Sequence, residues 1–272
     1  SSTNRTRGGV GYVYVPFQSE AGGIRILEAV GQDALYVNGE PRVGDPYGYG
    51  YLQLPVELRA GTNDFLFQFS RGQVRARLGT PRSPVMLNLR DLTLPDLIRG
   101  DQTATWGAVV VVNCTTNFLK DLSLSASCGG RKSVQTTLPT IPPLSSRKVG
   151  FCIEPYEIAA TNTVSLKLDL ARLKSRPTAL LDSQTTTLRL RRPDEHFKQT
   201  FRSDIDGSIQ YYAVAPAQPL SKNQPARALF LSTHGASVEA MGQADAYTSK
   251  TWGTLVAPTN RRPYGFDWED WG

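Results

Sequence analysis

The sequence predicts a multi-domain protein that is mostly β. With 272 residues the chain is longer than one typical domain, so two or three domains are expected. Short runs rich in β-branched and aromatic residues recur along it, and turn residues separate them, with 24 Gly and 18 Pro in the chain. In residues 1–80 no segment keeps a helical period over three turns, which favours strands there.

Residues 1–80 predict a first β domain. Strand signals occur in five segments: residues 11–17, 24–30, 34–37, 64–69 and 74–78. The dipeptide Asn38-Gly39 indicates a hairpin turn, because both residues tolerate a positive φ. Residues 61–63 (Gly-Thr-Asn) indicate another turn directly before an apolar strand.

This first domain resembles the galactose-binding-type jelly rolls that are appended to many glycoside-acting and other exported enzymes. The resemblance covers residues 24–78. It rests on four features: the turn Val37-Asn38-Gly39, the turn Gly44-Asp45, the aromatic segment 47–51, and the pattern L-x-x-G-x-N over residues 58–63. It implies a jelly-roll fold and, less specifically, a carbohydrate ligand.

Tyr47, Tyr49 and Tyr51 are the candidate ligand-stacking residues of this domain. They alternate along the chain, so an extended segment places all three rings on one face. The pattern leaves two roles open: stacking against a sugar ring, or packing in a structural ladder of tyrosines.

Residues 81–194 predict an immunoglobulin-like β-sandwich. Seven strands are expected: residues 85–92, 103–114, 122–128, 133–138, 147–153, 163–170 and 179–190. Along residues 163–170 (TVSLKLDL) apolar and polar residues alternate, as in a strand with one buried face. The segment contains no His, and its carboxylates lie singly in turns, so it is interpreted as a spacer or interaction module.

The three cysteines, Cys114, Cys128 and Cys152, all lie in this second segment. Their spacings fit no zinc motif, and an odd number leaves at least one thiol free. Two states stay open: a Cys128–Cys152 disulfide, or three free thiols. Neither a metal site nor a cofactor is predicted for the chain.

Residues 195–272 predict a change of architecture. Residues 197–203 and 209–215 alternate as a hairpin, and the apolar run 228–233 is expected to be a strand buried on both faces of a parallel sheet. A helix-compatible segment (241–249) and a short apolar strand (254–257) follow it. Strand, helix and strand in this order predict a right-handed βαβ crossover.

This last segment resembles the first half of an α/β-hydrolase domain of the prolyl-oligopeptidase or esterase type. The resemblance rests on FLSTHGAS (230–237) and LVAPTNRRPYGFDWEDWG (255–272). It implies that His234, Gly235 and Ala236 form an oxyanion loop, whose backbone donors stabilise the negative charge of acyl transfer. It also implies that Arg261, Tyr264 and Trp268 belong to a wall of the substrate pocket. The alternative is that the rings of this segment pack against the β domains.

The residues that would complete such a site are absent from the sequence. No G-x-S-x-G elbow occurs, and the only histidines are His196 and His234. A triad of Ser232 or Ser237 with His234 is disfavoured, because residues so close in sequence rarely reach the required geometry. The sequence therefore predicts accessory β domains plus part of an exported serine hydrolase (esterase or peptidase), with no catalytic residue in this chain. The alternative is a non-catalytic carbohydrate-binding or adhesion module.

Charge and composition limit the classes of partner that the sequence predicts. The net charge of +6 is spread along the chain, which argues against nucleic-acid binding, and no apolar run is long enough to span a membrane. The expected partners are an ester, peptide or carbohydrate-linked substrate and the remainder of the hydrolase domain, as a continuation or a second chain. The chain starts without Met, so a secreted or periplasmic protein with a removed export signal is expected, or a trimmed chain.

Overall fold

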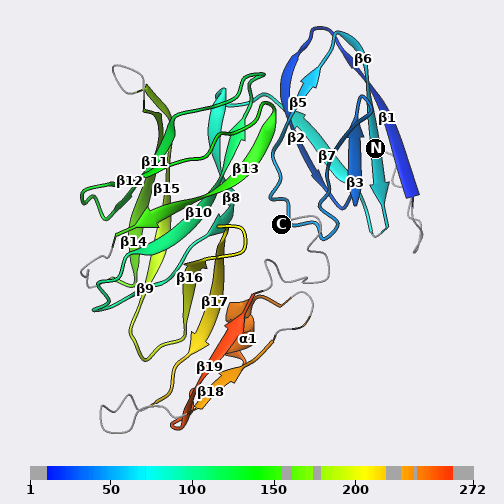
Figure 1. The fold of residues 1–272 in the computed structure, drawn as a ribbon. Coiled ribbons are helices and arrows are strands. Elements are labelled where there is room, and N and C mark those ends of the chain that lie inside the picture. The colour runs from blue at the N-terminus through cyan, green and yellow to red at the C-terminus, as the bar shows by residue number, and fades with distance from the viewer. Residues whose placement is uncertain are drawn as a thin grey trace.

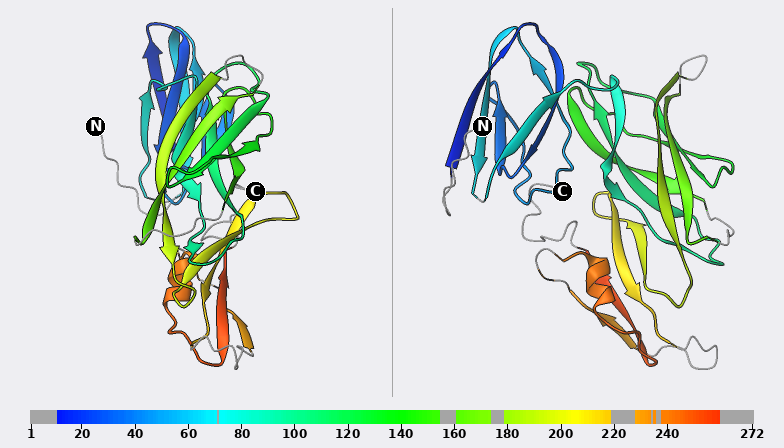
Figure 2. Two further views of the ribbon diagram at one scale, coloured as in Figure 1. Left: turned by 90° about the vertical axis from the view of Figure 1, so that its left-hand side faces the viewer. Right: turned by 180° about the vertical axis from the view of Figure 1, so that it is seen from behind.

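The structure is a computed structural model that describes residues 11–70, 72–154, 161–173, 179–218, 228–233, 235 and 238–259. In these residues the chain forms nineteen strands in five sheets and one helix (Figures 1 and 2). The mostly β, multi-domain class is confirmed. Every sheet lies within one of the ranges 1–80, 81–194 and 195–272, which we keep as proposed domain boundaries and call the first, second and third units.

The first unit is a two-layer sandwich. One sheet has the order β1-β6-β3-β4 and consists of β1 (Gly11–Ser19), β6 (Gly61–Phe69), β3 (Ala34–Val37) and β4 (Glu40–Val43). The other has the order β5-β2-β7 and consists of β5 (Leu54–Leu58), β2 (Gly23–Val30) and β7 (Arg75–Gly79). Leu27, Leu35 and Phe65 are among the buried side chains that join the two layers. Asn38 and Gly39 both have positive φ, which confirms the predicted hairpin turn.

The second unit is also a two-layer sandwich. Its smaller sheet has the order β13-β10-β8 and consists of β13 (Ser145–Ile153), β10 (Thr105–Asn113) and β8 (Val85–Thr93). Its larger sheet has the order β12-β11-β14-β15-β9 and consists of β12 (Val134–Thr137), β11 (Leu122–Cys128), β14 (Thr163–Arg172), β15 (Ala179–Arg191) and β9 (Leu97–Ile98). All seven predicted strands are present, and β14 alternates between exposed and buried residues as expected.

The two sandwiches are packed against each other through apolar side chains. In β2 the odd residues Leu27 and Ala29 face the core of the first unit, whereas Ile26 faces outwards. Ile26 is buried with Met86 and Val110 of the second unit. Because consecutive side chains of a strand point to opposite faces, β2 contributes to both cores at once.

The third unit is a single four-stranded sheet with one helix. The sheet has the order β16-β17-β19-β18 and consists of β16 (Phe197–Arg202), β17 (Ile209–Ala215), β19 (Gly253–Pro258) and β18 (Ala228–Leu231). β18 and β19 are parallel, as the crossover predicts, and α1 (Ala240–Asp245) lies between them in sequence. The helix packs through Ala240 and Ala244 on Ala213 and Ala257.

The expectation that residues 228–233 form a doubly buried strand is wrong. β18 is the edge strand of its sheet, and the side chains of Leu229 and Leu231 are 73% and 70% exposed. An α/β sheet is covered by helices on both faces, whereas the described part of the third unit has one helix of six residues. Apolar composition alone does not distinguish a central strand from an uncovered edge strand.

Hydrogen bonds attach the third unit to the second. Asp96 is 6% exposed, and its carboxylate accepts from both Arg189 Nε (2.7 Å) and the backbone N–H of Lys198 (2.8 Å). The Thr200 hydroxyl donates to the carbonyl of Trp106 in β10. In the described residues no helix is long and apolar enough to cross a membrane.

We expect Asp182→Asn to destabilise the second unit in a pH-dependent way. Asp182 is 9% exposed, and its carboxylate accepts from Arg82 Nη2 (2.5 Å) and from the backbone N–H of Leu87 (2.6 Å). Burial by itself raises the pKa of Asp182, but the bonds from Arg82, Leu87 and Gln184 outweigh it and hold this pKa below its usual range. The ionised group therefore stabilises the fold above pH 4, and this contribution is lost as the pH falls through the folded-state pKa.

The measurement is urea unfolding at pH 7 and at pH 3. At pH 7 the substitution should lower the unfolding free energy by about 2 kcal/mol, as for loss of a charged hydrogen bond, and the difference should narrow at pH 3. Asp169→Asn is the control, because Asp169 pairs with Lys167 on an exposed surface. An equal loss at both pH values would show that ionisation of Asp182 does not stabilise the unit.

Candidate functional site

The predicted hydrolase residues fall mostly outside the described part of the chain. This holds for five of them: His234, Ala236, Arg261, Tyr264 and Trp268. Gly235 is described and exposed, and its carbonyl accepts a hydrogen bond from the backbone N–H of Val238. The Ser232 hydroxyl lies 3.1 Å from the Tyr247 hydroxyl and accepts from Gln243 Nε2 at 2.8 Å.

The predicted stacking tyrosines do lie together. The Tyr49 and Tyr51 rings are stacked, with centroids 5.1 Å apart and an interplanar angle of 13°. The Tyr47 ring is tilted by 55° against Tyr49 at 6.4 Å. The three rings thus pack on one another, although residues 47–51 do not form a strand.

The segment that carries these rings is residues 44–53, which we call the tyrosine loop. It connects β4 to β5, and its start is fixed by Asp45, whose carboxylate accepts from the backbone N–H groups of Tyr49 (3.0 Å) and Gly50 (2.6 Å). Gly44 is required there, because a Cβ at this position would lie 2.0 Å from the carbonyl oxygen of Asp33.

The end of the tyrosine loop is attached to the second unit. Asn88 of β8 is 3% exposed, and its Nδ2 donates to the carbonyl of Tyr51 at 2.7 Å. The Ser146 hydroxyl of β13 donates to the carbonyl of Gln53 at 2.8 Å. Bonds at both ends therefore determine the position of the loop against the second sandwich.

A carboxylate from the first unit strengthens this contact. Glu28 of β2 accepts from Arg90 Nη2 (2.8 Å) and Gln53 Nε2 (3.0 Å), and it pairs with Arg77 (2.5 Å). Burial raises the pKa of Glu28, but the three donors more than compensate and lower this pKa below its usual value. Arg90 belongs to the second unit, so the carboxylate links the two sandwiches.

The contacts of Asn88 and Ser146 with the tyrosine loop border a cavity between the first and second units, which we call the junction pocket. It encloses about 690 Å³, within the usual size range of small-molecule sites. The first unit contributes Arg42, Tyr51 and Gln53 to its wall, and the second contributes Asn88, Asp91 and Lys148. The pairing of β8 with β10 is irregular between Asn88 and Thr93, and a bulge of this kind redirects side chains.

One donor in this wall has no partner. Arg42 donates from Nη2 to Glu40 (2.7 Å) and from Nη1 to the carbonyl of Pro41 (2.9 Å). Its Nε–H is buried and makes no hydrogen bond in the described structure. Leaving a buried donor unsatisfied costs about 1–3 kcal/mol.

A second cavity lies in the first unit, where the two layers are open between β1 and β7. It encloses about 1040 Å³ and is lined mainly by apolar and aromatic side chains, among them Phe17, Phe65 and Phe69. The inner face of β1 is left partly uncovered, because the facing sheet has three strands against four. The wall of this apolar groove also includes polar side chains, namely those of Arg25, Gln73, Arg75, Arg77 and Thr80.

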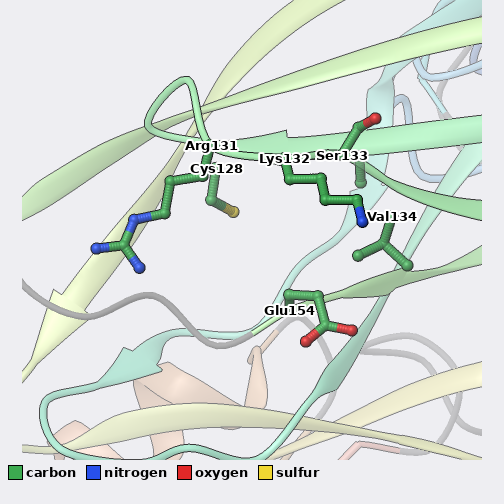
Figure 3. A pocket seen from close by; sticks show the side chains of 7 residues that line it. Cys128, Arg131, Lys132, Ser133, Val134 and Glu154 are labelled. Carbon is green, nitrogen blue, oxygen red and sulfur yellow. The ribbon is translucent and has the colours of Figure 1, made fainter.

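A third cavity, of about 680 Å³, lies beside Cys128 (Figure 3). Figure 3 shows its wall, with the Cys128 thiol between the side chains of Arg131, Lys132 and Glu154. Burial raises the pKa of Cys128 to about 11, so this thiol is protonated at neutral pH and is a poor nucleophile. The described residues of this wall include no aromatic ring.

Polar clusters in the third unit were missed by the sequence analysis. His196 Nδ1 lies 3.0 Å from Asp245 Oδ1, and His196 Nε2 lies 3.2 Å from Ser249 Oγ. None of these three residues lines the three cavities described above. They attach the start of β16 to the end of α1. Tyr211 donates to Glu239 in the same unit, and burial raises the pKa of the Tyr211 phenol.

The residues described contain no group of three or more His, Cys, Asp or Glu side chains that could hold a metal ion. All three cysteines are free, so the Cys128–Cys152 disulfide is not formed. The distances and burial that decide between the two thiol states could not be read from the cysteine spacing.

Comparison with known proteins identifies no family. No protein-family model and no curated protein matches the chain. Solved structures with partial likeness include an exo-chitosanase from Amycolatopsis orientalis, in complex with PNP-beta-D-glucosamine, at 11% identity and a TM-score of 0.34 over 76% of this chain and 28% of that one. A β-glucuronidase from Bacteroides uniformis has 12% identity and a TM-score of 0.36 over 87% of this chain and 30% of that one.

The expected relationship to serine esterases and peptidases is wrong, because the described chain is nearly all β and has one helix of six residues. The similar structures also include an FMN-binding β-glucuronidase at 11% identity and a TM-score of 0.28. The chain spans about a third of the length of these enzymes, 28–38%. With TM-scores this low, the likeness carries no information on a ligand or an activity. A His-Gly pair after an apolar strand is too short a signal to assign a family.

We expect the cysteines to react in the order of their burial. Burial raises the pKa of Cys114 and Cys128 to about 11, whereas Cys152 is less buried and its pKa is raised for the same reason. At pH 8, about one thousandth of a thiol with pKa 11 is ionised. Native protein treated with iodoacetamide should therefore be alkylated first at Cys152, as read by peptide mass spectrometry. Unfolding without reductant should expose three reactive thiols, and a count of one would reveal a disulfide.

Proposed function

We propose that this protein is a non-catalytic carbohydrate-binding module and that the junction pocket is its binding site. The observation that carries the proposal is the composition of the pocket wall, where an aromatic ring (Tyr51) and the polar side chains of Arg42 and Gln53 line one cavity. A sugar ring has an apolar C–H face and a rim of hydroxyl groups, so it needs an aromatic surface together with donors and acceptors.

The tyrosine loop supports this role through its rigidity. The Tyr47 ring contacts the Tyr49 ring, and the Tyr49 ring contacts the Tyr51 ring. Asp45 and Asn88 hold the two ends of the loop. A ring held in place before binding loses little conformational freedom when a ligand stacks on it, which favours affinity. Among the three candidate stacking residues, we assign ligand contact to Tyr51 and a supporting position to Tyr47 and Tyr49.

The other two cavities support the proposal less well. The apolar groove of the first unit has the larger volume but is lined mainly by apolar and aromatic side chains. The Cys128 pocket offers no ring among its described residues on which a sugar could stack. The same proposal includes two further points: the partner of the protein is a carbohydrate-linked molecule, and the protein is exported.

Substitution of Tyr51 tests this function. Tyr51→Ala should weaken binding of neutral polysaccharide about 5- to 10-fold, because ring contacts contribute about 0.5–1.5 kcal/mol beyond burial. Tyr51→Phe should keep most of the affinity. Retardation in native gels containing xyloglucan, galactomannan or hydroxyethylcellulose gives the comparison, with thermal unfolding to confirm that each variant is folded.

Tyr12→Ala is the matched control, because Tyr12 is a 62% exposed ring on β1. Loss of retardation in Tyr12→Ala with none in Tyr51→Ala would place the site elsewhere. If none of the polysaccharides retards the unsubstituted protein, the proposed function is wrong.

A further inference from the structure

Among the described residues, all charged side chains that line the junction pocket are paired within its wall. Arg42 Nη2 lies 2.7 Å from Glu40 Oε2, and Lys148 Nζ lies 2.7 Å from Asp91 Oδ1. The described part of the wall thus has two cations and two anions, and its formal charge is zero.

The Lys148–Asp91 pair is partly withdrawn from solvent, which raises the cost of breaking it. The side chains of Asp91 and Lys148 are 16% and 33% exposed. In the other pair Arg42 is 21% exposed, whereas Glu40 is 71% exposed. Ion pairs of this kind are screened less by water and salt than pairs on an open surface. A charged ligand would have to compete with a partner that already lies within 3 Å.

A ligand charge of either sign meets the same obstacle. The carboxylate of a uronic acid that approaches Lys148 would lie beside the Asp91 carboxylate, whose repulsion offsets the attraction to the ammonium. The ammonium of an amino sugar that approaches Asp91 would in the same way be repelled by Lys148. Like charges in one pocket disfavour binding, whereas an uncharged hydroxyl can bond to the outer atoms of an intact pair.

We propose that the junction pocket selects uncharged sugar chains and discriminates against both uronic-acid and amino-sugar chains. This inference rests on the proposed carbohydrate binding and adds its substrate class. The inference rests on the charge balance of the pocket wall. The discrimination comes from the existing ion pairs and not from the shape of the pocket.

The experiment is calorimetric titration of the whole chain, at pH 6 and low salt, with four hexamers. Cellohexaose and N-acetylated chitohexaose are uncharged, hexagalacturonate is anionic, and the deacetylated glucosamine hexamer is cationic. The two chitin-derived chains are matched, because removal of the acetyl groups is their only difference. We expect both uncharged hexamers to bind at least tenfold more tightly than either charged one.

A charge variant tests the cause of this selectivity. Asp91→Asn leaves Lys148 without its carboxylate, so the wall gains one positive charge, and hexagalacturonate should bind about tenfold more tightly than it binds the unsubstituted protein. Asp169→Asn removes a carboxylate from the Lys167 pair on β14, outside the pocket wall, and should leave all four affinities unchanged.

The outcomes separate the two proposals. Tight binding of a charged hexamer, equal to or above that of the uncharged ones, would overturn the selectivity and leave carbohydrate binding intact. Unchanged hexagalacturonate affinity in a folded Asp91→Asn variant would also overturn it. Absence of binding for all four hexamers would overturn both proposals.

Discussion

The hydrogen bond from the buried Asn88 side chain to the carbonyl of Tyr51 joins the first unit to the second at the place where the proposed site is built. An Asn amide in an apolar strand must find partners, because a buried polar group without a hydrogen bond is strongly unfavourable. Asn88 satisfies this requirement with the tyrosine loop on one side and the backbone N–H of Arg90 on the other. The order of the loop, the position of the Tyr51 ring and the walls of the junction pocket all depend on this contact.

The apolar interface next to the pocket makes the arrangement stable. Ile26 is buried with Met86 and Val110, so the two sandwiches are joined by side chains from sheet faces as well as by polar bonds. Glu28, two residues further along the same strand and on the same face, accepts from Arg90 of the second unit. Apolar burial thus holds the units together, while the polar bonds determine their register and leave a cavity with a charged but balanced wall.

Much of the fold could be predicted, since strand periodicity and turn chemistry are local. The seven strands of the second unit and the Asn38-Gly39 turn are all present. The missed strands are short or contain Pro, as in β4 (Glu40–Val43) and β5 (Leu54–Leu58), and these strands begin and end the tyrosine loop. The exposed position of β18 was not predictable, because it depends on which strands flank it and not on its own residues.

The candidate site was predictable only in one part. Alternating tyrosines at 47, 49 and 51 marked the loop, but the opposing wall comes from Asn88, Asp91 and Lys148, which no local pattern connects with it. The hydrolase interpretation failed for the opposite reason, since it extended a short local pattern to a whole family. Residues that meet only through domain packing require the structure.

The most direct test of the central claim is the NMR signal of the Arg42 Nε–H group during titration with cellohexaose, assigned by its loss in Arg42→Lys. Binding in the junction pocket predicts that this signal shifts as the sugar saturates, together with shifts at Tyr51. Saturable shifts confined to β1 and the apolar groove, with the Arg42 signal unchanged, would contradict it.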